Sequence, residues 1–358
     1  MRYAFPASCQ LVQSTLPAAC CPLPARISRG DQRLLTLAQI GVGYWGPNLL
    51  RNLSASKRCD VKTVADLASE RQEYVRRLYP NIQTTDNVDR VLQDPDVSAV
   101  IIATPVATHF ELATKALTAG KHILVEKPLA TSVKEVEEIA ALAAKNSLVA
   151  MVGHTFLFSP PVRYVKNLID TGTLGDVRYI YSQRLNLGRI RSDVDALWNF
   201  APHDVSIIQY WLGEPTPLSV IRHGAAYIQD DVADVVFLNI TYPNNIMANI
   251  HVSWLDPRRV RSMTVIGTKQ MVVYDDAADA KVAIHDKGID RKAASNGHVP
   301  VYDYRSGDVI LPKIDSQEPL RVELDHFFDC IENGTPCLTG PEHARKVVQI
   351  LSSTQACA

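Results

Sequence analysis

The sequence predicts an α/β fold in which a doubly wound parallel sheet is followed by a second, α+β domain with an open antiparallel sheet. Apolar runs of strand length alternate with helical patterns from residue 34 to residue 152, which is typical of a parallel sheet covered on both faces. After about residue 155 the pattern changes to successive strands with few helices. The length of 358 residues is enough for two domains.

A glycine-rich turn follows the first predicted strand, residues 34–40. Gly41, Gly43 and Gly46 have the spacing Gly-x-Gly-x-x-Gly, and Pro47 suits the first turn of a helix. An apolar stripe at helical spacing follows, made of Leu49, Leu50 and Leu53. The glycines allow a tight turn, and the helix N-terminus offers free N–H groups to a pyrophosphate. We therefore expect a dinucleotide-binding Rossmann domain.

An acid follows the second predicted strand, residues 59–65. Asp66 comes 20 residues after Gly46, where an acid can bind the ribose hydroxyls of adenosine. A carboxylate here would repel a 2′-phosphate, so NAD is expected rather than NADP, although Arg71 lies nearby. The alternative interpretation is a plain glycine turn followed by a solvated aspartate.

The later elements follow in order along the chain. In the first domain we expect helices at 69–78, 86–93 and 108–119, and a fourth helix that begins with a capping box at 132–135. Strands are expected at 97–103, 122–125 and 148–152. In the second domain we expect helices at 161–170, 203–212, 320–331 and 342–351, and strands at 177–185, 217–223, 232–241, 246–254, 260–266 and 270–274. Hairpin turns are expected at 243–245 and 267–269. Residues 276–318 lack strong periodicity and are expected to form an extended arm.

The domain boundaries follow from these patterns. Residues 1–32 lack periodicity and are interpreted as a disordered extension, or as sequence upstream of the true start. Residues 33–154 form the expected dinucleotide-binding domain, and residues 155–358 the expected substrate and oligomerisation domain. The segment 235–238 is apolar on both pleat faces, so we expect a homo-oligomer, either a dimer or a tetramer.

Composition argues against other classes of protein. The net charge is −1, from 37 basic and 38 acidic residues, so neither a nucleic-acid nor a membrane partner is indicated. No apolar run approaches the ~18 residues that span a bilayer. The seven cysteines form no Cys-x-x-Cys pair, which favours a reducing cytoplasm. No histidine pair has the spacing His-x-x-x-His, so no metal site is expected.

Three segments are expected to meet at the carboxyl ends of the parallel strands, where open α/β sheets bind ligands. Thr104 and Pro105 end one strand, and His109 opens the next helix. Glu126 and Lys127 end another strand. The start of the second domain's first long helix is expected to join them.

Lys127 and His203 are the candidate catalytic residues. Partial burial would lower the pKa of Lys127, so that it polarises a substrate hydroxyl or takes its proton while hydride leaves the adjacent carbon. The alternative is a surface lysine in a loop. His203 is expected at a helix N-terminus, which would keep the ring neutral as a proton acceptor or relay. A lone histidine is more often structural, and the same alternative applies to His109, His154, His223 and His251.

The chain resembles the Gfo/Idh/MocA family (glucose-fructose oxidoreductase and inositol dehydrogenase) over roughly residues 34–355, closest to nucleotide-sugar 3-dehydrogenase members. The segments that carry the resemblance are 41–48, 103–109, 126–128, 183–188 and 251–257. The resemblance implies a Rossmann domain, an open-sheet domain that forms oligomers, a catalytic Lys127 and a histidine at position 203. The cofactor contacts expected from it and from the turn are Gly41, Gly43, Tyr44, Trp45, Gly46, Asp66, Thr104, Pro105, His109, Glu126 and Lys127.

Two positions depart from the family pattern. The acid that the family commonly has four residues before the histidine is Asn199 here, and an amide cannot shuttle a proton at neutral pH. This puts a lysine–acid–histidine relay in doubt and leaves Lys127 and His203 as the pair. The usual Asn-Arg pair after the sixth strand is replaced by Thr155 and Phe156, so a cofactor contact is expected to be missing or rebuilt.

The expected function is that of an NAD-dependent dehydrogenase acting on a CH–OH group. It would oxidise a ring hydroxyl, at C3, of a UDP-N-acetylhexosamine to a 3-keto sugar for amino-sugar biosynthesis. Two alternatives are a family enzyme that acts on a polyol or free sugar such as an inositol, and a non-catalytic NAD-binding protein. The expected substrate contacts are Arg184, Asn186, Arg189, Asn199 and Trp254, with Arg258, Arg259 and Arg261 as a second set for a diphosphate.

Overall fold

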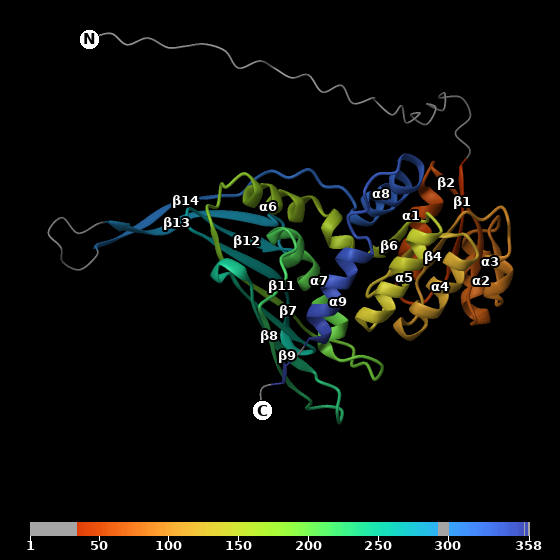
Figure 1. Ribbon diagram of the computed structural model, residues 1–358, viewed down its shortest axis with the longest axis horizontal. Helices are drawn as coiled ribbons and strands as arrows, with labels where there is room; N and C mark the ends of the chain where they lie inside the picture. The colour runs from red at the N-terminus through yellow and green to blue at the C-terminus, as the bar shows by residue number, and fades with distance from the viewer. Residues whose placement is uncertain (1–33, 293–300, 354, 357–358) are drawn as a thin grey trace, which may run out of the picture. The chain divides into compact units, whose positions relative to one another are not determined.

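The computed structural model describes residues 34–292, 301–353 and 355–356 (Figure 1). The expected extension at residues 1–32 lies outside the described residues. The chain from Leu34 onward forms one compact unit that contains two sheets. No helix in the described part of the chain is long and apolar enough to cross a membrane.

The first sheet is a doubly wound Rossmann sheet, which confirms the predicted fold class. Its six parallel strands have the order β3-β2-β1-β4-β5-β6. The strands are β1 (Leu35–Ile40), β2 (Cys59–Ala65), β3 (Gln83–Thr85), β4 (Ala99–Ile102), β5 (His122–Glu126) and β6 (Ala150–Gly153). The order reverses between β1 and β4, and ligands of such sheets bind at the carboxyl ends of the strands beside that reversal. The sequence did not predict β3, because its three polar residues carry no apolar pattern.

Helices connect these strands. They are α1 (Gly46–Ala55), α2 (Ser69–Leu78), α3 (Val88–Leu92), α4 (His109–Thr118) and α5 (Val133–Lys145). The predicted capping box is confirmed: Ser132 accepts the Glu135 N–H at 3.3 Å, and the Glu135 carboxylate accepts the Ser132 N–H at 3.3 Å. The bounds of α2 and the bounds of β2 also agree with those predicted.

The second sheet has nine strands in the order β14-β13-β12-β11-β7-β10-β9-β8-β15 (Figure 1). They are β7 (Val177–Leu187), β8 (Ser219–Ala225), β9 (Val235–Thr241), β10 (Met247–Ser253), β11 (Leu255–Gly267), β12 (Met271–Asp275), β13 (Val282–Lys292), β14 (Val301–Ile310) and β15 (Gln355–Ala356). The sheet is mostly antiparallel, as predicted, but β10 pairs with β7 in parallel, and so does β15 with β8. The sheet is therefore mixed.

The arm expected at residues 276–318 contains a long hairpin. Strands β13 and β14 pair antiparallel, from Ile284 with Ile310 to Lys292 with Val301. Among the described residues of these strands, only Val282 and Ile284 at the start of β13 form a buried alternating face of apolar side chains, whereas large side chains further along the hairpin, such as Tyr302 and Tyr304, are exposed. The alternation is therefore too short for a sequence pattern to reveal the hairpin. The guanidinium of Arg305 bonds the carboxylates of Asp286 and Asp290 instead, at 2.8 Å each.

Four longer helices complete the second domain: α6 (Pro160–Asp170), α7 (Ala196–Leu212), α8 (Pro319–Asn333) and α9 (Pro341–Ser352). The predicted start of α7 at His203 is wrong. The helix begins at Ala196, because Asp195 accepts the Trp198 N–H at 2.9 Å as an N-cap, and Pro202 lies inside the helix. His203 is therefore in the middle of α7, and a helix N-terminus does not set its charge.

One face of the second sheet is buried and the other is open. Along β9, Val236, Leu238 and Ile240 are buried, whereas Phe237 is 42% exposed. Phe237 stacks on His251 of β10, with ring centroids 4.1 Å apart. Other large side chains exposed on the neighbouring strands are Tyr179, Tyr181 and Met247. A single chain thus leaves an aromatic sheet face in water.

Candidate active site

The glycine turn at the end of β1 has two tightly packed glycines and one open one. Gly41 has φ +92°, and a Cβ on it would lie 2.5 Å from the carbonyl oxygen of Ala103. A Cβ on Gly46 would lie 2.6 Å from the carbonyl oxygen of Gly41. A Cβ on Gly43 would meet no atom within 4 Å. The fold itself requires the first and third glycines, whereas Gly43 leaves space beside the turn.

The turn and the residues around it fit a dinucleotide. No side chain caps the N-terminus of α1. Pro47 has no N–H and the Asn48 N–H donates to the Trp45 carbonyl oxygen at 2.9 Å, so the N–H groups that can face an anion are those of residues 43–46. Gly43 leaves room for a pyrophosphate to approach the backbone. The carboxylate of Asp66 accepts the Val42 N–H at 2.7 Å and the Ala68 N–H at 2.9 Å, which holds it beside the turn. Tyr44 and Trp45 lie on the turn and are 92% and 39% exposed.

His109 connects two strand ends. Its Nδ1 lies 2.8 Å from the carbonyl oxygen of Pro128, and its Nε2 lies 2.9 Å from the carbonyl oxygen of Thr104. Burial lowers the pKa of His109 although both carbonyls raise it. Both ring nitrogens face backbone carbonyls, and a neutral ring can donate to only one of them. His109 thus lies between the loops that follow β4 and β5. Thr104 follows β4, and its hydroxyl also bonds that of Thr108 at 2.7 Å.

Glu126 and Lys127 lie at the end of β5, both half-buried. The Lys127 ammonium donates to the carbonyl oxygen of Asn199 on α7 at 2.8 Å, and Glu126 accepts the Lys127 N–H at 3.3 Å. Oε1 of Glu126 is buried without a hydrogen-bond partner among the described residues. The peptide bond between Lys127 and Pro128 is cis.

Burial moves the pKa values of this pair toward one another. It lowers the pKa of Lys127 to about 8; the Glu126 charge opposes that shift and the guanidinium of Arg184 adds to it. Burial also raises the pKa of Glu126 to about 7, while Lys127 and the Trp45 side chain counteract it. A lysine of this kind can accept and return a proton near neutral pH.

His203 lies one helical turn after Asn199. Its Nδ1 is buried without a hydrogen-bond partner among the described residues, and its ring meets Phe156 edge to face at 5.0 Å. Burial lowers the pKa of His203 well below 6.5, and the charges of Lys127 and Arg184 lower it further. The ring is therefore neutral at pH 7, as expected, but burial and nearby cations are the cause.

Two of the expected substrate contacts are structural. Arg184 is buried and bonds Asp204 through Nε at 2.7 Å and through a terminal nitrogen at 3.4 Å, while Ser182 bonds the same carboxylate at 2.6 Å. Its guanidinium is already paired, so it is not free to hold a diphosphate. Trp254 is fully buried against Phe200, so it has no surface to offer a ligand.

The other expected contacts are accessible or partly so. Arg189 is exposed, and Asn186 is half-buried beside Gly188. Asn199 contributes its backbone carbonyl, which holds Lys127. Pro105, the N-cap of a short 3₁₀ turn (Val106–Thr108), follows Thr104 beyond β4.

Thr155 and Phe156, at the position where the family pattern differs, make contacts within the protein. The Thr155 hydroxyl donates to Glu323 at 2.7 Å, and the Phe156 ring has the Arg184 guanidinium 4.9 Å from its centroid. Glu323 is fully buried, and both burial and the Glu126 charge raise its pKa well above 4.5. Sequence reasoning missed Glu323, although the signal was present: it is an acid on the apolar face of α8, next to Leu324.

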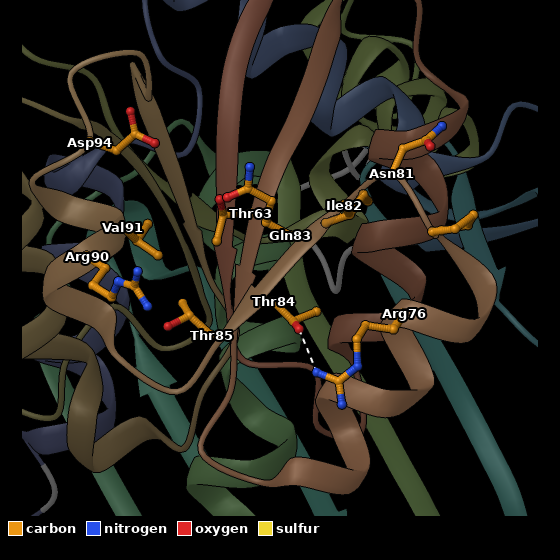
Figure 2. Close-up of a pocket in the computed structure, with 11 residues that line it drawn as sticks. Thr63, Arg76, Asn81, Ile82, Gln83, Thr84, Thr85, Arg90, Val91 and Asp94 are labelled. Carbon is orange, nitrogen blue, oxygen red and sulfur yellow. Dashed lines mark hydrogen bonds between the residues drawn. The ribbon is translucent and has the colours of Figure 1, made fainter.

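A separate cavity of about 590 Å³ lies at the edge of the first sheet (Figure 2). It is lined by residues of β2, β3, α2 and α3, and Arg76 points to Thr84 within it, at 2.8 Å. None of the expected site residues lines this cavity. It is therefore distinct from the crevice around Lys127.

The curated proteins that are similar to this chain include dehydrogenases, uncharacterised oxidoreductases and a 2,7-anhydro-N-acetylneuraminate hydratase. One is the 4-carboxy-2-hydroxymuconate-6-semialdehyde dehydrogenase of Sphingobium sp., 32% identical over 52% of this chain and 62% of that protein. A scyllo-inositol 2-dehydrogenase of Bacillus subtilis is 27% identical over 86% of this chain and 87% of that protein. A UDP-N-acetylglucosamine 3-dehydrogenase of Acidithiobacillus ferrooxidans is 26% identical over 86% and 92%.

Solved structures and family profiles agree with this likeness. GenD2 from gentamicin A biosynthesis, solved in complex with NAD, aligns with a TM-score of 0.76 at 25% identity, covering 93% of this chain and 96% of that chain. The oxidoreductase family profile with an NAD-binding Rossmann fold matches residues 35–154, and the profile of the same family's C-terminal domain matches residues 162–273. The chain belongs to the Gfo/Idh/MocA family of oxidoreductases.

Proposed function

We propose that this protein is an NAD-dependent dehydrogenase that oxidises the C3 hydroxyl of a UDP-N-acetylhexosamine to a 3-keto sugar. The observation that carries the proposal is the half-buried Lys127, whose pKa is lowered to about 8. It is bonded to α7 and close enough to the neutral His203 for its charge to shift that ring's pKa. The glycine turn lies nearby, because Gly41 packs against Ala103, the residue that follows β4, and β4 pairs with β5.

The cofactor would be held by backbone groups and one carboxylate. The free N–H groups at the start of α1 and the space at Gly43 suit a pyrophosphate, and Asp66 suits the adenosine ribose. The same carboxylate would repel a 2′-phosphate, which supports NAD over NADP. When bound, the nicotinamide supplies the hydride acceptor.

Lys127 would be the base for the substrate hydroxyl. In the neutral amine, one N–H can continue to donate to Asn199 while the lone pair accepts the hydroxyl proton. Once the lysine is protonated, the nearby carboxylates of Glu126 and Asp204 stabilise its charge. His203 would orient the hydroxyl or receive its proton, because its neutral ring has an unpaired nitrogen. Asn199 cannot carry a proton, so the relay would have two members rather than three.

Arginines on neighbouring strands support a diphosphate-bearing substrate. Strand β11 pairs with β7 so that Arg261 lies opposite Arg184. The pairing register shifts between Leu255 and Val260, and the exposed Arg258 and Arg259 lie within this irregular stretch. Arg184 is paired with Asp204 and Arg261 lies 3.5 Å from Asp276, yet the charges of Arg184 and Arg259 help burial to lower the pKa of Arg261, which indicates repulsion among these cations. A dianionic diphosphate would relieve that repulsion. The relative from Acidithiobacillus ferrooxidans is named for such a substrate.

A free polyol is the second candidate, supported by the scyllo-inositol 2-dehydrogenase relative of almost equal identity. A panel of UDP-sugars, free sugars and inositols with NAD, followed at the NADH absorbance band, separates the two. We expect NADH formation with UDP-N-acetylglucosamine or its epimer. Turnover of inositols alone would favour the second candidate, and no turnover with any member would favour a non-catalytic NAD-binding protein.

We also propose that the open face of the second sheet forms a homo-oligomer, because Tyr179, Tyr181, Phe237 and Met247 are exposed on it. A Phe237→Lys variant should shift the mass measured by light scattering toward that of a single chain. The matched control is Tyr227→Lys, at a residue that is 72% exposed outside these strands. A wild-type protein that is monomeric at micromolar concentration would contradict the proposal.

The glycine turn predicts opposite behaviour for two substitutions. Gly43→Ala should leave thermal stability nearly unchanged, because its Cβ meets nothing within 4 Å, yet weaken NAD binding by at least about 10-fold through contact with the pyrophosphate. Gly41→Ala should destabilise the protein by about 1–3 kcal/mol even without NAD, because φ is +92°. Thermal unfolding and NAD titration measure both effects. A Gly43→Ala protein that binds NAD as wild type does would refute the assignment.

Replacing the proposed base should remove one limb of the pH profile. For wild type, the rate of oxidation should rise as pH passes about 8, because Lys127 becomes neutral there. Lys127→Met should lower the chemical step by ~10²–10⁴ and abolish that rise. NAD should still bind within a few fold, since backbone groups hold it. Lys134→Met, at an exposed helix position, is the control and should behave as wild type. Near-normal turnover by Lys127→Met would exclude the mechanism.

The diphosphate contact can be tested by comparing two substrates. The double substitution Arg258→Gln and Arg259→Gln should raise KM for the UDP-sugar roughly 10- to 100-fold, the effect of losing ~1.5–3 kcal/mol of charged hydrogen bonding. It should leave KM for the corresponding free sugar unchanged. Arg321→Gln, with a side chain 78% exposed on α8, is the control. An equal loss for both substrates would mean that these arginines do not contact the diphosphate.

A further inference from the structure

Three side chains of metal-ligand type lie together outside the crevice. His326 and Cys330 are one turn apart on α8, and Cys337 lies in the loop between α8 and α9. Their ligating atoms all lie within 4.8 Å of one another. The sequence contains no His-x-x-x-His pair and so predicted no metal site, whereas the pair at helical spacing here is His-x-x-x-Cys.

The spacing suits a tetrahedral ion. Nε2 of His326 lies 3.5 Å from Sγ of Cys330. With Zn–N near 2.0 Å and Zn–S near 2.3 Å, two tetrahedral ligands of these kinds lie about 3.6 Å apart. The His326 tautomer also suits ligation: Nε2 accepts the Leu338 N–H at 3.0 Å, so Nε2 carries the lone pair. An ion would take the place of that N–H, which could then donate to a thiolate.

The two thiols are electronically unequal. A hydrogen bond from Cys337 lowers the pKa of Cys330 to about 5, and His326 lowers it as well against the effect of burial. The same hydrogen bond and burial raise the pKa of Cys337. A divalent cation would bind both sulfurs as thiolates and release the protons that they carry.

The fourth coordination position would be open. His326 and Cys337 line a cavity of about 770 Å³, whose wall also includes Glu214 and His343. Cys330 is buried behind them, only 4% exposed. Three protein ligands plus a water from a cavity is a common arrangement for zinc.

The loop that bears Cys337 is already fixed to the first sheet. The Thr339 carbonyl accepts the Val152 N–H of β6 at 2.9 Å, and Sγ of Cys337 lies 4.0 Å from the carbonyl oxygen of Ala150. An ion at this point would link α8 to the edge strand β6. Binding would therefore require movement at Leu338, whose N–H now occupies Nε2 of His326, while the rest of the loop stays fixed to β6.

We propose that His326, Cys330 and Cys337 form a Zn²⁺ site whose fourth ligand is water from the adjoining cavity. The site is separate from the proposed dehydrogenase chemistry, so failure of either proposal leaves the other intact. The ion would link α8, the following loop and β6, and its fourth position would be open to water as in catalytic zinc sites rather than closed as in structural ones.

The test uses the full chain, reduced and stripped of metal, and titrated with Zn²⁺ alone and with Co²⁺ as a spectroscopic probe. We expect one ion per chain, a Co²⁺ spectrum with thiolate charge-transfer bands and tetrahedral ligand-field intensity, and a higher Tm with Zn²⁺. Cys330→Ser, Cys337→Ser and His326→Gln should each weaken binding at least ~10-fold. Their Tm without metal, compared with that of wild type, shows whether they fold.

Two controls address the other thiols. Cys59→Ser removes a buried free thiol elsewhere, and joint replacement of Cys9, Cys20 and Cys21 by Ser removes the thiols of the N-terminal segment. Both should keep the Co²⁺ spectrum. A spectrum that survives Cys330→Ser, the absence of stoichiometric binding, or a Cys330–Cys337 disulfide that persists in protein purified with zinc would overturn the proposal.

Discussion

The hydrogen bond from Lys127 to the carbonyl oxygen of Asn199 joins the first sheet to the second domain at the crevice. The ammonium of Lys127 is half-buried between β5 and α7, and this burial lowers the pKa of Lys127. The same burial raises the pKa of Glu126, which has one carboxylate oxygen without a partner among the described residues. A carboxyl and an amine whose pKa values converge can share a proton near neutrality, which suits acid–base chemistry.

A second buried pair supports this arrangement from the side of the second sheet. Arg184 and Asp204 bond one another within the core, and the Arg184 guanidinium covers Phe156, whose ring meets His203. Removing one partner of a buried ion pair leaves an uncompensated charge and generally costs ~3–5 kcal/mol, so this pair resists change. The charge of its positive member contributes to lowering the pKa of both Lys127 and His203. Thr155 and Phe156 stand where the family pattern led us to expect an Asn-Arg pair, and an arginine from another strand lies over the Phe156 ring.

Local patterns predicted much of the first domain. The bounds of β2 and α2 and the capping box at Ser132 followed from sequence because alternation, helical spacing and capping are local properties. The polar strand β3 and the exposed hairpin β13–β14 were missed because neither buries a regular apolar face. The start of α7 was misplaced because Pro202 imitates a helix start, while the true N-cap, Asp195, lies earlier.

The candidate site was harder to predict because partners came from distant elements. Sequence indicated Lys127 and Asp66 through their positions after strands, but it gave no sign that Arg184 is paired with Asp204 or that Trp254 is fully buried. Burial, not a helix terminus, explains why His203 is neutral.

Direct titration of the Lys127 side chain tests whether this lysine is a base with a lowered pKa. The measurement is the pH dependence of the lysine side-chain NMR signals in protein labelled at Cε, with the Lys127 signal assigned by its loss in Lys127→Arg. The account predicts a midpoint at about 8. A midpoint near the ordinary lysine value of 10.5 would contradict it.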